Sequence, residues 1–323
     1  MKAFPQVTCV GEALVDLIAT KRGVTLSDAH DFTKYAGGSA ANIAVGLANL
    51  GIRTAFVGRV GKDPFGKFLG DEFARHSVDC SGVIYDPDRK TRLAFVSRTT
   101  SGDRDFEFWE RQPAGEQLRW SDIDLKRVVR SKIVHIGSFL LLQEPSRSTA
   151  LRLAEALQRS GCILSFDPNL RLSLWRSKSE ARRIHLAMVK RATILRLNAE
   201  EAFFLTKKRV LESAVKELRA LGPSTVVVTM GNKGCYASSE QGSTWVKGFR
   251  VKVADTTGCG DGFFAALLAG LVRAASTPHD LSLDSMYSIC RTANAVGALT
   301  ATRYGVIGAL PTSAQVRRFL STR

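Results

Sequence analysis

The sequence lacks the marks of several protein classes. Its 6 cysteines are scattered, with no Cys-x-x-Cys pair and no histidine at metal-ligand spacing, which argues against a zinc finger or a disulfide-stapled domain. No stretch approaches the roughly 18 uninterrupted apolar residues of a membrane-spanning helix, and residues 1–10 contain no long apolar run of a signal peptide. We therefore expect a cytoplasmic protein that contacts no membrane, with cysteines that are small buried thiols.

Acidic residues are scarce relative to basic ones. The chain has 30 Asp and Glu against 46 Lys and Arg, which gives a net charge of +16. Such an excess raises the question of nucleic acid, because clustered Lys and Arg neutralise phosphates. The basic residues are dispersed, however, and no basic tail or aromatic-basic stripe accompanies them. The sequence therefore favours a solvated basic surface that attracts anionic substrates, and no nucleic-acid partner.

The chain also lacks repeats, low-complexity segments and long linkers, so its 323 residues are expected to form one large domain. Beyond residue 130, strand-like runs alternate with helical stretches, which predicts βαβ units and a parallel sheet with helices on both faces. The expected strands are 7–10, 52–58, 132–136, 162–166, 193–197 and 225–229, and the expected helices are 39–50, 63–75, 147–159, 179–189 and 212–221.

Two segments depart from this pattern. Residues 91–108 alternate apolar and polar side chains around a Ser-Gly-Asp turn at 101–103, which predicts a hairpin. Residues 14–35 lack a long helical period and are expected to supply short strands before a glycine pair. Together the two segments predict a small separate sheet.

Two glycine-rich segments open apolar helices. Residues 36–51 begin Ala-Gly-Gly-Ser-Ala-Ala-Asn, and residues 255–262 read Asp-Thr-Thr-Gly-Cys-Gly-Asp-Gly before the apolar run 263–272. A glycine turn that enters a helix leaves unpaired N–H groups at the positive end of the helix dipole, where an anion binds. Asp261 falls in the first helical turn, as an ordinary N-terminal charge or as a general base beside a phosphate.

As an ordered pair, these segments resemble the two signatures of the PfkB, or ribokinase-like, family of sugar kinases, and the resemblance covers almost the whole chain. It implies a three-layer αβα fold with a central mostly parallel sheet and a small β lid from residues 14–36 and 92–110. It also implies phosphoryl transfer from ATP to a sugar hydroxymethyl group, with Mg²⁺ and K⁺ as cofactors and a homodimer through the lid. No Walker or protein-kinase motif is present, so the turn 258–261 is the expected anion site.

The resemblance also assigns residues to roles, each beside a structural alternative. It makes Asp261 the base, with Gly258, Cys259 and Gly260 as oxyanion donors. Asp16 is otherwise a turn residue, Asn42 a helix cap and Asn294 a solvent-facing helical residue. The remaining implied positions are Asp16, Gly37, Gly38, Asn42, Arg111, Asn169 and Arg171 for the sugar, Asn198, Thr229, Gly231, Gly234 and Asn294 for the nucleotide, Glu201 for Mg²⁺ indirectly, and Asp255 and Thr257 for K⁺.

The segments 143–147 and 167–175 look like those of bacterial and plant fructokinases, which implies fructose phosphorylated at its 6-hydroxyl. If two of Arg104, Arg111 and Arg171 converge on the pocket, 2-keto-3-deoxygluconate becomes the better substrate, because a fork of donors suits a carboxylate. A third hypothesis, a sugar-binding regulator without activity, predicts loss of Asp261 or Gly258, and both are present.

Overall fold

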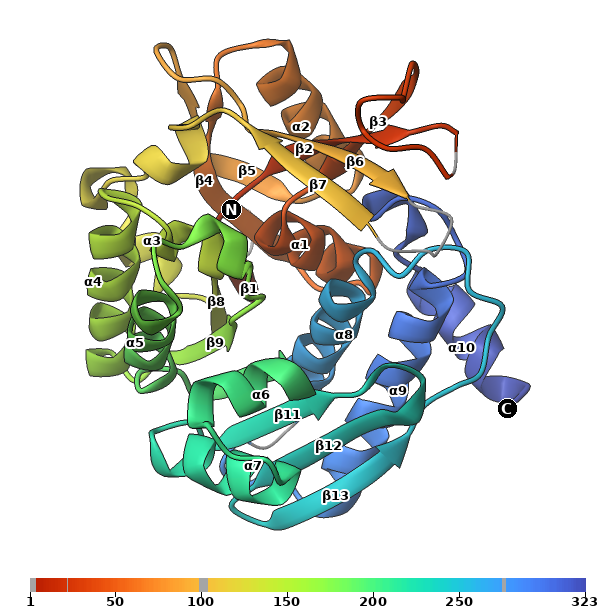
Figure 1. The fold of residues 1–323 in the computed structure, drawn as a ribbon. Helices are drawn as coiled ribbons and strands as arrows, with labels where there is room; N and C mark the ends of the chain where they lie inside the picture. The colour runs from red at the N-terminus through yellow and green to blue at the C-terminus, as the bar shows by residue number, and fades with distance from the viewer. Residues whose placement is uncertain (1–3, 22, 99–103, 275–276) are drawn as a thin grey trace.

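The computed structural model describes residues 4–21, 23–98, 104–274 and 277–323, and these form a nine-stranded central sheet with helices on both faces (Figure 1). Neighbouring strands from β11 to β5 pair in parallel, and β12 and β13 extend one edge antiparallel. Across the sheet the order is β13 (Gly242–Lys247), β12 (Gly234–Ser239), β11 (Thr225–Thr229), β10 (Ile194–Asn198), β9 (Ile163–Asp167), β8 (Ile133–Gly137), β1 (Val7–Val10), β4 (Thr54–Gly61) and β5 (Asp79–Asp86).

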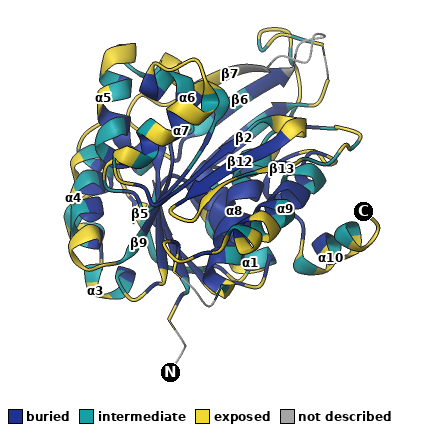
Figure 2. Cartoon of the chain, turned by 90° about the horizontal axis from the view of Figure 1, so that it is seen from below, coloured by how far each residue is buried: buried dark blue, intermediate teal, exposed yellow. Residues whose placement is uncertain are grey.

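The inner strands are short apolar runs because helices cover them on both sides. Figure 2 shows this burial gradient, from the dark sheet to the exposed outer faces of the helices. One face packs α1 (Ser39–Asn49), α2 (Pro64–Arg75), α8 (Cys259–Arg273), α9 (Leu283–Thr300) and α10 (Ser313–Ser321). The other face packs α3 (Leu125–Val128), α4 (Ser146–Arg159), α5 (Lys178–Val189), α6 (Ala199–Thr206) and α7 (Leu211–Ala220).

Helices α1 and α8 lie side by side at the centre of the molecule (Figure 1). Their close approach depends on small residues, since a side chain at Gly46 of α1 would come within 2.8 Å of Ala265 Cβ in α8. Every residue of α1 from Ser39 to Leu47 is buried. The two glycine-led segments, which are far apart in sequence, are thus held as one unit.

A second sheet of four strands, in the order β3 (Phe32–Gly37), β2 (Leu14–Ala19), β6 (Leu93–Arg98) and β7 (Arg104–Trp109), covers one end of the central sheet (Figure 1). This confirms the small separate sheet and its hairpin, although the turn 101–103 lies outside the described residues. One side of the sheet packs on α2, where Lys34 Nζ lies 4.0 Å from the centre of the Phe68 ring. The four strands form the lid.

The strands and helices expected from the sequence are present, with ends that differ by up to three residues. Asp63 caps α2 as predicted, with its Oδ1 accepting from the N–H groups of Phe65 and Gly66 at 3.0 and 2.8 Å. Strands β5, β12 and β13 and helices α3 and α10 were not predicted, and of α9 only the helical setting of Asn294 was expected. β5 and β13 are edge strands with largely exposed or half-buried residues, so their apolar signal is weak.

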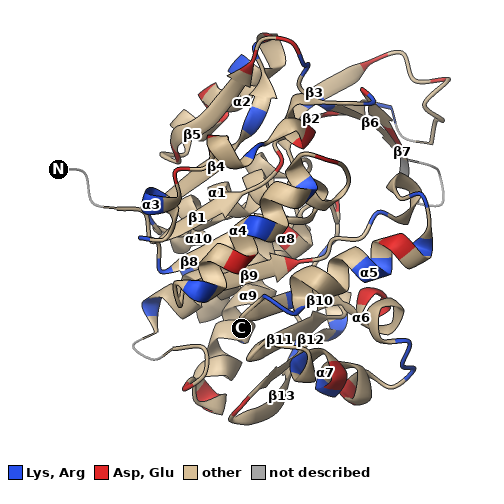
Figure 3. Ribbon diagram, turned by 90° about the vertical axis from the view of Figure 1, so that its left-hand side faces the viewer, with Lys and Arg blue, Asp and Glu red and all other residues tan. Residues whose placement is uncertain are grey.

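Two composition-based expectations can be compared with the structure. The Lys and Arg residues are spread over many elements and do not gather on one (Figure 3). Cys9, Cys235 and Cys290 are buried as expected, whereas Cys80, Cys162 and Cys259 are half-buried. Within the described parts of the chain, no helix is both long and apolar enough to cross a membrane.

Candidate active site

The starts of α1 and α8 meet beside the carboxyl ends of the central strands, where open α/β sheets hold their ligands. Both helices begin after a glycine with positive φ, 98° at Gly38 and 73° at Gly258. A side chain at Gly258 would also come within 2.3 Å of Val306. These positions therefore need glycine. The N–H groups of a helix start have no partner within the helix. Here the Ala40 N–H of α1 donates to Glu12 Oε1 at 3.4 Å, and the Cys259 N–H of α8 donates to the Thr256 carbonyl at 3.4 Å.

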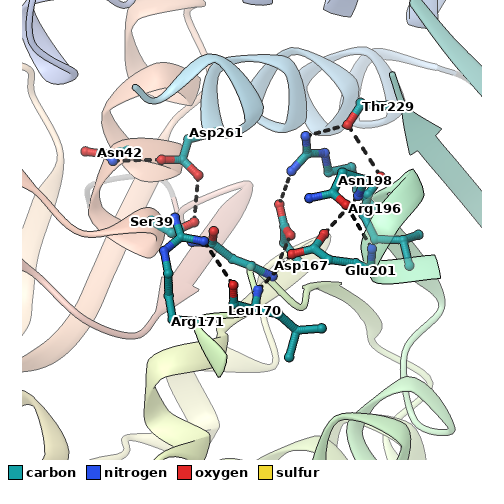
Figure 4. Close-up of polar contacts among 12 residues, drawn as sticks. Ser39, Asn42, Asp167, Leu170, Arg171, Arg196, Asn198, Glu201, Thr229 and Asp261 are labelled. Carbon is teal, nitrogen blue, oxygen red and sulfur yellow. Dashed lines mark hydrogen bonds and ion pairs between the residues drawn. The ribbon is translucent and has the colours of Figure 1, made fainter. Parts of the chain in front are cut away.

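Asp261, in the first turn of α8, is held by two donors from α1 (Figure 4). The hydroxyl of Ser39 donates to Oδ1 at 2.7 Å, and Asn42 Nδ2 donates to Oδ2 at 2.8 Å. Burial raises the pKa of Asp261, and the nearby Asp167 raises it further, while the two hydrogen bonds and Arg196 oppose this shift. A carboxylate with a raised pKa at the wall of a cavity is suited to accept a proton from an alcohol.

The lid cavity, as we call the space of about 270 Å³ beneath the lid, brings together most of the residues predicted to bind the sugar. The lid contributes Asp16, and the core contributes the others. Gly37 does not line this cavity, but a side chain there would approach Asp16 Oδ2 to 2.3 Å, so this glycine makes room for the carboxylate. The polar and glycine residues that line the lid cavity include Glu12, Asp16, Gly38, Ser39, Asn42, Asn169, Arg171, Arg196, Asn198, Thr257, Gly258 and Asp261.

A second space of about 220 Å³, here the edge cavity, lies beside strands β11 and β12 and the start of α8. It collects the predicted nucleotide residues Thr229, Gly231, Gly234 and Asn294, together with Cys259, and it is lined largely by glycines and apolar side chains such as Phe249, Val251 and Val253. Only Asn198, of the residues predicted for the nucleotide, lines the lid cavity instead.

Asn294 shows why the solvent-facing alternative is wrong. The residue is only 8% exposed. Its Nδ2 donates to the carbonyl groups of Val246 and Lys247 in β13, both at 3.2 Å. Asn294 therefore ties α9 to the edge strand β13.

Glu201 and Asn198 form a capping box at the start of α6. Asn198 Oδ1 accepts from the Glu201 N–H at 2.9 Å, and Glu201 Oε2 accepts from the Asn198 N–H at 2.8 Å. The other Glu201 oxygen accepts from the Leu170 N–H at 2.7 Å, which positions the loop that carries Asn169 and Arg171. Burial, and then Asp167, raises the pKa of Glu201. With both oxygens engaged, Glu201 suits an indirect contact to a metal.

The described residues contain no group of three or more His, Cys, Asp or Glu side chains that could hold a metal ion. A Mg²⁺ ion that is bound mainly through nucleotide phosphates and water, as is usual in kinases, does not need such a group of side chains. Asp255 is buried, and its Oδ1 accepts from the Thr257 N–H at 3.0 Å and the Thr257 hydroxyl at 2.7 Å. A K⁺ site at these two residues stays a prediction.

Two of the three arginines considered for a substrate carboxylate, Arg171 and Arg111, do not line the same cavity. Arg171 lines the lid cavity. Arg111 is exposed and lines neither cavity, because the chain turns away after β7 at Glu110, whose φ is 88°. The sugar contact of Arg111 stays a prediction, and the side chain of Arg104 lies outside the described residues.

Sequence reasoning missed three residues of the site: Ser39, Glu12 and Arg196. Glu12 is 5% exposed, with Oε1 accepting from the Ala40 N–H at 3.4 Å and Oε2 buried without a hydrogen-bond partner. Burial raises its pKa to about 7, and the charge of Asp261 adds to this effect. The available signals were an acidic residue two positions after a buried strand and a lone arginine inside the apolar strand β10.

The site combines a glycine-led anion site, a buried carboxylate beside it and a cavity on each side. This arrangement is suited to a phosphotransferase that acts on an alcohol group. Residues 5–313 match the pfkB family of carbohydrate kinases, and the chain belongs to this family. It is 39% identical over 322 residues to the probable chloroplastic fructokinase-6 of Arabidopsis thaliana, a match that covers 98% of this chain and 82% of that protein.

Solved structures agree with the family and the ribokinase-like fold. A double mutant of the fructokinase from Vibrio cholerae O395, with fructose, ADP and potassium ion bound, has a TM-score of 0.89 and 32% identity, covering 99% of this chain and 100% of that one. The fructokinase from Xylella fastidiosa with bound ATP has a TM-score of 0.90 and 28% identity, covering 99% of each chain. The regulator hypothesis is therefore set aside, and the protein is an enzyme.

Proposed function

We propose that this enzyme transfers the γ-phosphoryl group of ATP to the 6-hydroxyl of fructose. The observation that carries the proposal is the position of Asp261, at the wall of the lid cavity and in the helical turn whose preceding residues also border the edge cavity. The similar proteins named fructokinase, one of them bound to fructose and ADP, supply the identity of the two substrates.

In this proposal the sugar occupies the lid cavity and the nucleotide the edge cavity. Asp16, Asn42 and Asn169 bind sugar hydroxyls, and Arg171 lies beside them. Asp261 accepts the proton of the 6-hydroxyl while the N–H groups at Gly258, Cys259 and Gly260 stabilise charge on the phosphoryl oxygens. Mg²⁺, when bound with ATP, would neutralise phosphate charge. Asp255 and Thr257 would hold K⁺ beside the turn 258–261. A potassium ion is bound in the Vibrio cholerae protein.

Arg171 is the residue that keeps 2-keto-3-deoxygluconate as a second candidate. A carboxylate would be favoured by two of the three arginines first considered. Of these, Arg171 lines the lid cavity, Arg111 lines neither cavity, and the side chain of Arg104 is not among the described residues. Fructose, which carries no carboxylate, is therefore preferred.

The lid is proposed to close over the sugar, since a closed site excludes water that competes as phosphoryl acceptor. A homodimer through the lid is proposed from its exposed aromatic side chains, of which Trp109 is 61% exposed. A cytoplasmic location also remains a proposal.

A coupled ADP-release assay tests the function with fructose, ribose, tagatose, 2-keto-3-deoxygluconate and adenosine as acceptors. We expect the highest kcat/KM with fructose, and a product whose phosphate is on carbon 6. A higher kcat/KM with 2-keto-3-deoxygluconate would move the assignment to the second candidate.

A further inference from the structure

Among the described residues, Arg196 on β10, Thr256 and Gly260 line both cavities, and of these Arg196 is the charged one. Its side chain lies directly below the first turn of α8, as Figure 4 shows. A phosphoryl group that passes from the edge cavity to Asp261 must pass this turn. The guanidinium is therefore located where the transferred group changes cavities.

Two hydrogen-bond partners hold the guanidinium in one orientation, the charged Asp167 and the neutral Thr229. Its Nη1 donates to Asp167 Oδ2 at 2.7 Å, and its Nη2 donates to the Thr229 hydroxyl at 2.7 Å. Its Nε is buried and has no hydrogen-bond partner. The group thus keeps unused donor capacity next to the anion site.

Arg196 also explains why residue 260 is glycine. A Cβ at Gly260 would lie 2.8 Å from both Nη1 and Nη2 of Arg196 and 3.1 Å from its Cζ. Gly260 does not have a positive φ, so the turn itself does not demand glycine there. The backbone of the anion site and the guanidinium are in direct contact because no side chain separates them.

Arg196 places a positive charge beside the start of α8, where acidic neighbours stabilise it. The start of a helix is the positive end of its dipole, and a cation there is unfavourable. Asp167 offsets part of this cost and, with Glu201, keeps the pKa of the guanidinium raised although burial lowers it. A phosphate with two or three negative charges, placed between the guanidinium and the N–H groups of α8, would accept hydrogen bonds from the guanidinium and from these N–H groups.

We propose that Arg196 is a further catalytic residue, whose guanidinium contacts the phosphoryl group in transit between the edge cavity and the lid cavity. The proposal rests on the proposed function. In the step, the acceptor oxygen forms a bond to the γ-phosphorus, the bond from that phosphorus to the bridging oxygen breaks with its electron pair leaving on ADP, and the proton of the acceptor goes to Asp261. Arg196 stays protonated and stabilises the charge on the moving group.

The competing explanation is that Arg196 and Asp167 form only a structural ion pair. Arg59 provides the matched control, because its guanidinium is similarly buried and bonds to Asp86 and Asp122, both at 2.9 Å, but it lines neither cavity. Arg59→Gln and Arg196→Gln each remove a partly buried guanidinium from acidic partners. Only the second change removes charge from the path of the phosphoryl group.

The experiment measures kcat, the KM values of fructose and ATP, and Tm for wild type, Arg196→Gln and Arg59→Gln. We expect Arg196→Gln to lower kcat on the order of 10²-fold to 10³-fold with the KM of fructose within about threefold, and Arg59→Gln to lower Tm with kcat within about threefold. Guanidinium ion added to Arg196→Ala should restore part of the lost kcat and should not raise that of Arg59→Ala.

A folded Arg196→Gln variant with kcat within about threefold of wild type would overturn the proposal, as would an equal kcat loss in Arg59→Gln. If Arg196→Gln does not fold, Arg196→Lys decides, since it keeps a charge for Asp167 but not the planar fork. We expect its kcat to fall at least about tenfold with Tm retained, and an unchanged kcat would reject the role. Should wild type phosphorylate none of the sugars tested, the proposed function fails, which is a separate result.

Discussion

The lid cavity and the edge cavity share the start of α8, yet they are built from different materials. The lid cavity presents charged and amide side chains, among them Asp16, Asn42, Arg171 and Asp261. The edge cavity presents glycines and apolar side chains, with its one asparagine of α9 bonded to backbone. We infer that the first recognises its ligand by side-chain hydrogen bonds and the second by shape and backbone contacts. Replacing a polar side chain should therefore lower activity far more in the lid cavity than in the edge cavity.

The largest effect is expected at Asp261, where the chemistry of the lid cavity is concentrated. Asp261→Asn keeps the shape of the side chain and removes its ability to accept a proton, so kcat should fall on the order of 10²-fold or more. Binding of ATP, which we propose to occupy the edge cavity, should stay nearly unchanged by calorimetry. A variant whose kcat remains within about threefold of wild type would remove Asp261 as the base.

A paired comparison of Asp16→Asn with Asn232→Ala tests the contrast directly. Loss of charged hydrogen bonds at Asp16 should lower kcat/KM for fructose by about 10-fold to 100-fold. Asn232, which lines the edge cavity and is exposed, should change kcat/KM for ATP by less than about threefold when truncated. Equal losses in the two variants, each with its own substrate varied in steady-state assays, would show that the cavities do not differ as proposed.

Burial of the Glu12 carboxylate in the lid cavity is expected to lower the free energy of unfolding. Its pKa is about 7 in the folded protein against an ordinary 4.5, so the folded state holds the proton longer than the unfolded state does. This group therefore stabilises the fold below pH about 4.5, and that stability is lost as pH rises to about 7. Glu12→Gln should remove the loss, on the order of 2 to 3 kcal/mol.

Urea unfolding of both proteins at pH 5 and pH 8 measures this difference. The free energy of unfolding of Glu12→Gln, relative to wild type, should be higher at pH 8 than at pH 5. The same relative stability at both pH values would mean that Glu12 ionises normally. A glutamine at the same position controls for shape, because it retains the oxygen that faces the Ala40 N–H.

The lid should respond to sugar and not to nucleotide. Amide hydrogen exchange in peptides that cover β6 and β7 is expected to slow by at least about fivefold at saturating fructose, because closure protects the hairpin. ATP alone should leave these peptides unchanged. Exchange that is indifferent to fructose would count against a lid in this hairpin, and protection by ATP alone would erase the distinction between the cavities.

The smallest effect is expected at Cys259, which lines the edge cavity and whose Sγ lies 3.8 Å from the Asp255 carbonyl oxygen. Cys259→Ala should keep kcat within about twofold, because this cavity relies on backbone. A thiol at a helix start is expected to have a lowered pKa, so iodoacetamide should inactivate wild type, with protection by ATP and resistance in the alanine variant.

The alternative for Cys259 is an inert thiol that is tolerated because it is small. Peptide mapping separates the two cases. If Cys259 stays unlabelled while activity falls, or if labelling is the same with and without ATP, the reactive thiol lies elsewhere.

The amino-acid sequence alone determined those features that depend on near neighbours. The spacing of apolar residues was sufficient for the inner strands and most helices, and the glycines at 38 and 258 marked where α1 and α8 begin. The placement of Asp261 in the first turn of α8 also followed from local pattern. These features are local because helix starts and strand periodicity involve residues a few positions apart. The pairing of the two glycine segments came from the family resemblance.

Only the tertiary structure decided which side chains share a site. The hydrogen bond from Ser39 to Asp261 joins residues 222 positions apart, and no periodicity predicts such a contact. The same holds for Arg196, whose place below α8 depends on the order of strands in the sheet, and for Arg111, which lines neither cavity. Burial likewise creates the raised pKa of Glu12, because desolvation depends on everything packed around a group.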